Sequence, residues 1–327
     1  MKSCRSFVFI FVAGTSGLRL PTPTSIYRRS IAGALAAAFG TLPFPIEGRA
    51  ELPVFGSGGR LDKVRSGEVD LAALYESNPV DLSGLNLPTG CVGAENAALI
   101  FVGSGGPDRE TAAMQRALVD QDAISGLQRC VAVINWKPFF TSDTNRLSFV
   151  SRDIGRKLGT ALAREAPSLK SLHIIGTSAG SFAADAMVTA YVEARAGRER
   201  AAVRLSLTDP FTARAGAAPN VGRGADLFGR SADFAEHILN TDDPVPNTDI
   251  PLPLCYVYDV TGAAQRKTFR PPEPTGDFLS DLVLSALGYH NWPLSWLALN
   301  CETRVVRGRV ALPSHEALPR GAVVRVP

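Results

Sequence analysis

SLHIIGTSAG, residues 171–180, joins an apolar run to a sharp turn of small residues. The run Leu172–Ile175 is typical of a buried strand, and residues 182–196 after the turn have the pattern of a helix. A Gly-x-Ser-x-Gly sequence between a strand and a helix predicts a tight turn that projects Ser178 beyond the sheet. Glycine and alanine beside the serine allow close packing of a strained backbone. We therefore predict that Ser178 is a nucleophile.

Short apolar runs alternate with amphipathic segments on both sides of this stretch. Strands are predicted at 97–102, 131–136, 172–175, 203–207, 235–239 and 254–260, and helices at 108–122, 144–165 and 182–196. Such alternation indicates a mostly parallel sheet with helices on both faces and right-handed crossovers. The sequence therefore predicts one α/β domain over residues 51–327, with a long loop at 212–230 and one or two strands in the tail 303–327.

The composition of the 327-residue chain supports a folded core and argues against nucleic-acid binding. Apolar residues make up 45% of the sequence, which excludes a disordered chain. The formal net charge is +3, but residues 1–50 contain six basic residues and one acid, leaving 28 basic against 30 acidic residues in the remainder. Because the body also lacks a basic stripe with interleaved aromatics, we expect no nucleic-acid partner.

The first 50 residues have the composition of a targeting leader. Lys2 and Arg5 precede the apolar run 7–13, and the twin arginine Arg28-Arg29 precedes a second apolar run, 31–39. A secretory signal followed by a twin-arginine signal resembles the layered leaders of thylakoid-lumen proteins in algae with complex plastids. The alternative is one secretory signal with a spacer, which predicts a secreted protein.

Four cysteines remain after the leader: Cys91, Cys130, Cys255 and Cys301. No Cys-x-x-Cys spacing occurs, so the sequence predicts no zinc site. One or two disulfides in an oxidising compartment and burial as free thiols are equal alternatives, and four cysteines allow three pairings.

A nucleophilic serine requires a histidine that accepts its proton. Where a serine stands on a Gly-x-Ser-x-Gly turn of this kind, the chain order is serine, acid, histidine, and the base belongs in a loop beyond the final strand. His173 lies in the strand before the serine, His237 lies in the middle of a strand, and His315 lies in a proline-flanked tail. His290 follows the last clear strand and precedes an apolar segment, so we predict that it is the base.

The histidine in turn requires an acid that orients it. Asp209, Asp242, Asp243 and Asp259 all follow predicted strands, at the sheet edge where active sites of parallel sheets form. The residue pattern alone leaves these four open, and the Asp209-Pro210 pair also fits a turn.

Backbone N–H groups are expected to hold the oxyanion. Ala179 follows the nucleophile and is one candidate, and the glycine-rich loop 103–106 after the first strand offers Ser104 or Gly105 as the second. The loop lacks the Gly-Lys-Ser/Thr and full Gly-x-Gly-x-x-Gly patterns, so a phosphate site is the weaker interpretation, and an ordinary turn is the other alternative.

Residues 98–297 resemble the pancreatic-type lipases of the α/β-hydrolase superfamily. The matching stretches are INWK at 134–137, HIIGTSAGSFAA at 173–184, LTDPF at 207–211, FAEHILNTDDPVP at 234–246, and the histidine loop. The resemblance implies an α/β-hydrolase fold and places the acid at Asp209, within a context similar to the Leu-Asp-Pro of that family. Val102 stands where the family has a histidine before the oxyanion donor. Only 37 residues follow His290, too few for the family's C-terminal β-sandwich.

The resemblance implies a hydrolase of carboxylic esters of acyl lipids, with Ser178, Asp209 and His290 as catalytic residues and Ala179 and Ser104 as oxyanion donors. It implies no metal or cofactor, and it allows transient contact with a membrane surface. Residues 276–289 stand where the family has a lid, with an ordinary packing helix as the alternative. An acyltransferase or thioesterase with the same triad, and a catalytically silent scaffold with this fold, are the other functions considered.

Overall fold

The computed structural model describes residues 80–139, 144–212, 224–243, 245, 247–271, 288–302, 305–306, 309–310 and 319–327. The chain separates into two compact units, Met1–Pro43 and Phe44–Pro327, and every described residue belongs to the second. The predicted leader, residues 276–287 of the predicted lid and residues 213–223 of the predicted loop lie outside the described residues.

A seven-stranded parallel sheet forms the centre of the described unit, in the order β2-β1-β3-β4-β5-β6-β9. Its strands are β1 (Asn96–Phe101), β2 (Cys130–Ile134), β3 (Ser171–Thr177), β4 (Ala202–Thr208), β5 (Phe234–Leu239), β6 (Tyr256–Asp259) and β9 (Val323–Arg325). The chain adds β2 on one side of β1, and then β3 and later strands on the other side. The order therefore reverses between β1 and β3, which is where parallel sheets open a crevice at the carboxyl ends of their strands.

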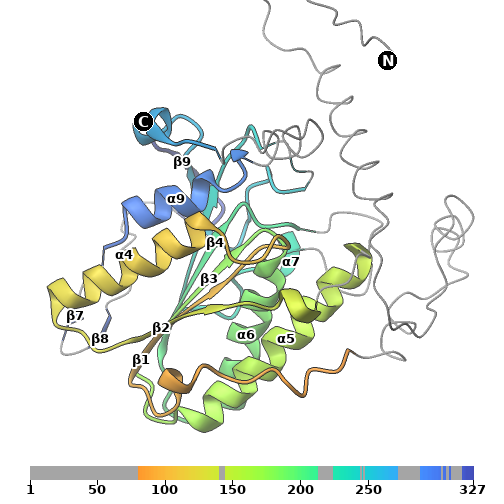
Figure 1. The fold of residues 1–327 in the computed structure, drawn as a ribbon, viewed down its shortest axis with the longest axis vertical. Helices are drawn as coiled ribbons and strands as arrows, with labels where there is room; N and C mark the ends of the chain where they lie inside the picture. Colours follow the sequence, from red (N-terminus) through yellow and green to blue (C-terminus); the bar gives the residue numbers. More distant parts are fainter. Residues whose placement is uncertain are drawn as a thin grey trace, which may run out of the picture. The chain divides into compact units, whose positions relative to one another are not determined.

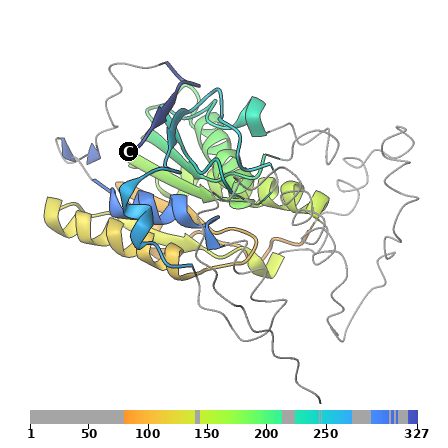
Figure 2. The same cartoon turned by 90° about the horizontal axis from the view of Figure 1, so that it is seen from above.

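Helices cover both faces of the sheet (Figures 1 and 2). α4 (Arg109–Ser125) and α9 (Trp292–Leu299) pack together on one face, while α5 (Thr144–Glu165) and α6 (Gly180–Ala194) pack together on the other. Alternate residues of β3 divide between the two cores: Ile174 belongs to the core that contains α5 and α6, and Ile175 to the core that contains α4 and α9. The α/β class predicted from the alternating pattern is confirmed.

α5 and α6 approach closely because α5 has glycine where the helices cross. A Cβ atom at Gly155 would lie 2.1 Å from the carbonyl oxygen of Ala183, and one at Gly159 would lie 2.3 Å from that of Met187. No real side chain tolerates these distances, so the two glycines set the separation of the helices and the position of α6 under the sheet.

The smaller elements are η1 (Thr89–Cys91), η2 (Lys137–Phe139), η3 (Ala264–Thr268), the four-residue α7 (Gly224–Leu227) and the antiparallel pair β7 (Val305–Val306) and β8 (Arg309–Val310). α7 falls within the segment predicted as a loop, and α9 is a helix that the sequence showed only as an apolar segment. No described helix is long and apolar enough to cross a membrane.

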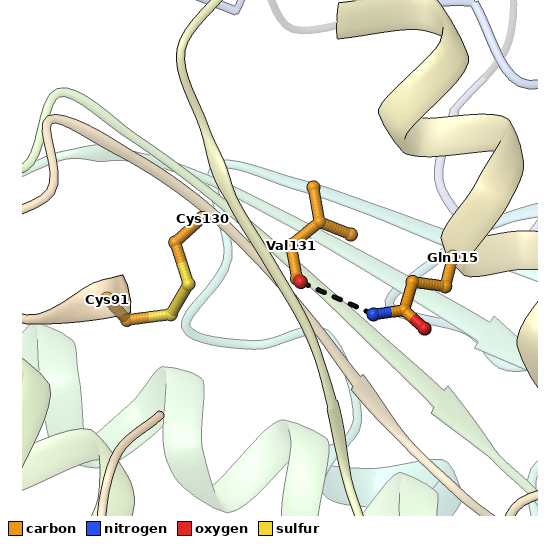
Figure 3. The surroundings of a disulfide bond; sticks show 4 residues. All are labelled: Cys91, Gln115, Cys130 and Val131. Carbon is orange, nitrogen blue, oxygen red and sulfur yellow. Dashed lines mark hydrogen bonds between the residues drawn. A yellow bond between two sulfur atoms is a disulfide. The ribbon is translucent and has the colours of Figure 1, made fainter. Parts of the chain in front are cut away.

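A disulfide between Cys91 and Cys130 joins η1 to the first residue of β2 (Figure 3). On the other side of β2, the side-chain amide of Gln115 donates to the carbonyl of Val131 at 3.5 Å, linking the strand to α4. Cys255 and Cys301 are free thiols, so the described chain combines the two alternatives, with one disulfide and two unpaired cysteines.

Candidate active site

Ser178 lies in a strained turn between β3 and α6. Its φ angle is +52°, a left-handed conformation that is uncommon for a residue with a Cβ atom, and its side chain is partly exposed. The turn is fixed by two backbone hydrogen bonds to the end of β4: Ser178 N donates to Thr208 O, and Phe211 N donates to Ser178 O, both at 3.1 Å. The strand, turn and helix predicted from the Gly-x-Ser-x-Gly stretch are therefore present.

Glycines on both sides of the turn are required by close packing. A Cβ atom at Gly180 would lie 2.4 Å from Val102 O at the end of β1, and one at Gly176 would lie 2.7 Å from the Cβ of Ala184 in α6. The two positions could not hold a larger residue without moving α6 away from the sheet. The two glycines of the motif are therefore required because the first turn of α6 packs closely against the ends of β1 and β3.

The glycine-rich loop after β1 lies beside Ser178. A Cβ atom at Gly103 would lie 3.4 Å from the Cβ of Ser178. The loop is held by Gly106 N, which donates to Gly103 O at 3.1 Å, and by the indole N–H of Trp136, which donates to Val102 O at 2.7 Å. This contact places the loop and the serine on opposite sides of the switch point between β1 and β3.

The predicted oxyanion donors lie on this loop and at the start of α6. Ala179 is the residue before α6, and Ser104 is exposed in the loop. Within the described part of the chain, the backbone N–H groups of Ser104 and Ala179 donate no hydrogen bond. Unused N–H groups beside a partly exposed serine are suited to binding a developing oxyanion.

His290 lies in a loop that is anchored on both sides. Before it, the carbonyl of Tyr289 accepts from the side-chain amide of Asn240 at 3.2 Å, and after it, the amide of Asn291 donates to Asp108 at 2.9 Å. The next residue, Trp292, is fully buried, and its indole N–H donates to Val260 O at 2.9 Å. These contacts hold the imidazole in a buried position with little freedom to turn.

The acid that meets His290 is Asp243. Nδ1 of His290 lies 2.5 Å from Oδ2 of Asp243, which also accepts from the hydroxyl of Thr248 at 2.7 Å, while Oδ1 accepts from Val245 N at 3.0 Å. Burial alone would raise the pKa of Asp243, but the His290 charge and the hydrogen bonds from His290, Thr248 and Val245 lower it below its ordinary value. Asp243 is thus held as a carboxylate.

Asp209, the acid expected from the lipase resemblance, does not make this contact. It follows β4, its φ angle is +38°, and it is fully buried. Its Oδ1 atom accepts from Asn240 N at 2.8 Å. Burial and the neighbouring charge of Asp243 raise the pKa of Asp209 well above its ordinary value. The geometry therefore corrects the pairing: Asp243, one of the four acids that the residue pattern left open, orients His290.

The sequence pattern could not distinguish Asp209 from Asp243. Asp209 and Asp243 follow β4 and β5, which are neighbours, so both acids reach the same edge. Both also precede His290 and follow Ser178 in chain order, so neither order nor strand position separates them. What distinguishes the two acids is the hydrogen bond from the hydroxyl of Thr248 to Asp243. Thr248 lies in the irregular segment after β5, and hydrophobic periodicity does not predict this contact.

One group of potential metal ligands occurs among the described residues, and it consists of Asp209, Asp243 and His290. Their candidate ligand atoms lie within 4.8 Å of one another. The 2.5 Å between His290 Nδ1 and Asp243 Oδ2 is a hydrogen-bond distance. It is shorter than the roughly 3 Å that separates neighbouring ligands of an ion with bonds of about 2 Å. The donor set therefore fits a histidine–carboxylate pair better than a metal centre.

Ser178 and His290 are not hydrogen-bonded in this structure. Nε2 of His290 is buried and has no hydrogen-bond partner among the described residues. The structure thus brings Ser178 to the loop 103–106 and His290 to Asp243, with both groups at the carboxyl edge of the sheet. Nucleophile–base contacts are often looser without substrate and tighten when it binds.

The remaining described histidines belong to the core. Nε2 of His173 lies 2.8 Å from the hydroxyl of Ser206, which donates to Glu236. His237 is fully buried within β5, and burial lowers its pKa to about 3. Neither imidazole is available to Ser178, and His315 lies outside the described residues.

Comparisons with protein-family models, with curated proteins and with solved structures found no match for this chain.

Proposed function

We propose that this protein is a serine hydrolase of the α/β-hydrolase type that cleaves carboxylic esters. The observation that carries the proposal is the strained Ser178, which meets a loop with unused N–H groups at the switch point of a parallel sheet. The buried His290–Asp243 pair at the same edge supports it. In chain order the three residues run serine, acid, histidine, as the nucleophile elbow of this fold requires.

Each residue has a defined part in the proposed reaction. The hydroxyl oxygen of Ser178 attacks the ester carbonyl while its proton passes to Nε2 of His290, whose Nδ1–H is held by Asp243. The N–H groups of Ala179 and Ser104 stabilise the oxyanion. His290 then returns the proton to the departing alcohol, leaving an acyl group on Ser178. Water, activated by His290 in the same way, releases the acid and restores the serine.

Acyl lipids are the proposed substrates, and this step rests on the lipase resemblance alone. If the leader directs the chain to a thylakoid lumen, membrane glycerolipids are the substrates at hand, and transient contact with a membrane surface is part of the proposal. The lid at 276–289 is also a proposal, because all but its last two residues lie outside the described chain.

A catalytically silent protein with the same fold is the second candidate. The observation that favours it is the absence of a hydrogen bond between Ser178 and Nε2 of His290. An acyltransferase or thioesterase would use the same residues with a different acceptor, and no contact in the structure favours either over hydrolysis.

Labelling of the purified chain with a fluorophosphonate probe separates the two candidates. We expect wild-type protein to be labelled and Ser178→Ala to remain unlabelled, because only an activated serine attacks the phosphorus atom. Ser125→Ala is the matched control, since Ser125 lies on α4 and, among the described residues, its hydroxyl donates only to the carbonyls of Gln121 and Asp122 in its own helix. Unlabelled wild-type protein would support the silent candidate.

The identity of the acid is tested by Asp243→Asn. An amide at this position cannot hold the imidazole in the required tautomer, so we expect kcat for a soluble ester to fall by about 10⁴-fold, as for the corresponding change in other triads. Asp242→Asn is the matched control. Asp242 is the adjacent residue, it is exposed, and it pairs with Arg266 at 2.8 Å instead of with His290. Equal losses in the two variants would contradict the assignment.

A further inference from the structure

We propose that Asp209 is a positioning residue, held as a neutral carboxylic acid whose hydroxyl donates to the Asp243 carboxylate and so fixes the Asp243–His290 pair. This inference deepens the proposed function and rests on it for its catalytic meaning. The protonation of Asp209 itself is a property of the folded chain and can be tested without activity.

One carboxyl oxygen of Asp209 is buried without a hydrogen-bond donor among the described residues. Asp209 has no exposed surface, and its Oδ1 accepts from Asn240 N. Its Oδ2 has no donor among the described residues. A buried carboxylate oxygen without a donor is costly, whereas the hydroxyl of a protonated carboxyl group needs an acceptor. The acceptor at hand is the carboxylate of Asp243, which places an oxygen within 4.8 Å of an oxygen of Asp209.

Asp209 and Asp243 are neighbouring buried carboxyl groups, and only one of them can carry a negative charge at low cost. Two carboxylates buried together cannot both ionise without a large electrostatic cost. Asp243 has His290, Thr248 and Val245 as donors, whereas Asp209 has Asn240 alone. The group with more donors keeps the negative charge, and the group with fewer keeps the proton.

Among the described residues, no positively charged side chain lowers the pKa of Asp209. The acidic groups that raise its pKa are Asp243 and Asp242, both from the segment after β5, and burial raises it further. His290, from the loop before α9, bonds to Asp243. Arg266, within η3, is bonded to Asp242 at 2.8 Å.

The consequence is a saturated Asp243 carboxylate. A carboxylate offers about four acceptor positions. His290, Thr248 and Val245 occupy three, and the hydroxyl of Asp209 supplies the fourth donor. A hydrogen bond from a neutral acid to a carboxylate is among the stronger kinds, so it restricts rotation of Asp243 and of the imidazole attached to it.

Activity measurements with two substitutions test the positioning role. Asp209→Ala removes the donor to Asp243, and we expect kcat/KM to fall about 10- to 100-fold, the usual loss for a hydrogen bond to a charged group. Asp209→Asn keeps a neutral donor of the same shape, so it should recover most of that loss. The pH profile should follow the same pattern, with a displaced acid limb in Asp209→Ala and a restored one in Asp209→Asn. If Asp209 were the ionised acid, Asp209→Asn would be as inactive as Asp209→Ala.

Two measurements without substrate test the protonation directly. We expect the infrared difference spectrum of wild type minus Asp209→Asn at neutral pH to contain the carbonyl-stretch band of a protonated carboxylic acid. The contribution of Asp185, whose pKa is raised to about 7, is common to both proteins and cancels. We also expect the stability of Asp209→Asn relative to wild type to grow as pH rises above about 4, because the unfolded aspartate then loses a proton that the folded one keeps. No band and a pH-independent difference would overturn the inference. An unlabelled Ser178 with the band present would instead contradict only the proposed function.

Discussion

At the scale of single residues, strained backbone conformations occur at the carboxyl edge of the sheet. Three described residues other than glycine have positive φ angles, and two of them, Ser178 and Asp209, belong to the candidate site. Each follows a strand directly, where the chain must turn sharply to place a side chain beyond the sheet. Strained backbone persists where surrounding contacts fix it, and here the ends of β4 and β5 supply them.

Asp185 shows that a raised carboxyl pKa alone does not mark the site. It lies in the middle of α6, and its Oδ1 accepts from Gly229 N at 2.9 Å. Burial raises the pKa of Asp185 to about 7. The group has no acidic neighbour bonded to a histidine, so its shift is a property of packing.

Asp185→Asn should change how stability depends on pH. The folded pKa lies above the unfolded one, so the stabilising contribution of Asp185 is complete below about pH 4 and is lost as pH rises to about 7. Asparagine does not titrate, so the variant does not lose stability in this way. The unfolding free energy of the variant minus that of wild type should therefore increase between about pH 4 and about pH 7 by up to roughly 4 kcal/mol. Urea unfolding at several pH values measures it. A constant difference between the two proteins would show that Asp185 is ionised in the folded state.

At the scale of elements, hydrophobic periodicity predicted the strands of the central sheet and the amphipathic helices. Strands β1 to β6 lie where apolar runs occur, and α5 has the predicted bounds 144–165. α9 was not predicted because it is apolar on all sides and has no periodic pattern, as expected for a short helix packed against both α4 and β5. β9 is three residues long and obtains its place from pairing with β6, which is tertiary information.

The same limit applies to the site. Ser178 and His290 could be proposed from chain order, because the serine motif is local and the histidine follows the last core strand. The choice of acid could not, because Asp209 and Asp243 are equivalent in order and strand position. Only the folded contacts of Thr248, Val245 and Asn240 distinguish the two carboxyl groups.

Gly155→Ala tests how α6 is positioned. A methyl group would collide with Ala183 O at 2.1 Å, so α5 and α6 must separate. We expect the unfolding free energy to fall by about 1–3 kcal/mol even though alanine favours a helix by about 1 kcal/mol. Because α6 begins two residues after Ser178, kcat should fall as well. Gly84→Ala is the control, since a Cβ atom there meets nothing within 4 Å. Equal stability of the two variants would contradict the close crossing.

At the scale of the whole molecule, the site lies at the carboxyl ends of the parallel strands and the disulfide lies at an amino end. Ser178, Asp209 and Asp243 follow the carboxyl ends of β3, β4 and β5, whereas Cys130 is the first residue of β2. β2 is an edge strand and pairs only with β1 in the sheet. Its partner β1 leads into the loop 103–106, so anchoring β2 also supports the strand that carries the candidate oxyanion loop.

Replacing Cys91 and Cys130 by alanine should therefore weaken the fold more than the chemistry. The disulfide closes a segment with a sequence separation of 39. Its loss increases the entropy of the unfolded chain, and we expect the unfolding free energy to fall by about 2–4 kcal/mol. Dithiothreitol should lower the stability of wild type to the level of the double variant and leave that variant unchanged, since Cys255 and Cys301 are already thiols. Fluorophosphonate labelling of the folded variant should persist, because the carboxyl edge of the sheet is intact. A variant that keeps its stability but loses labelling would show that the disulfide acts on the site itself.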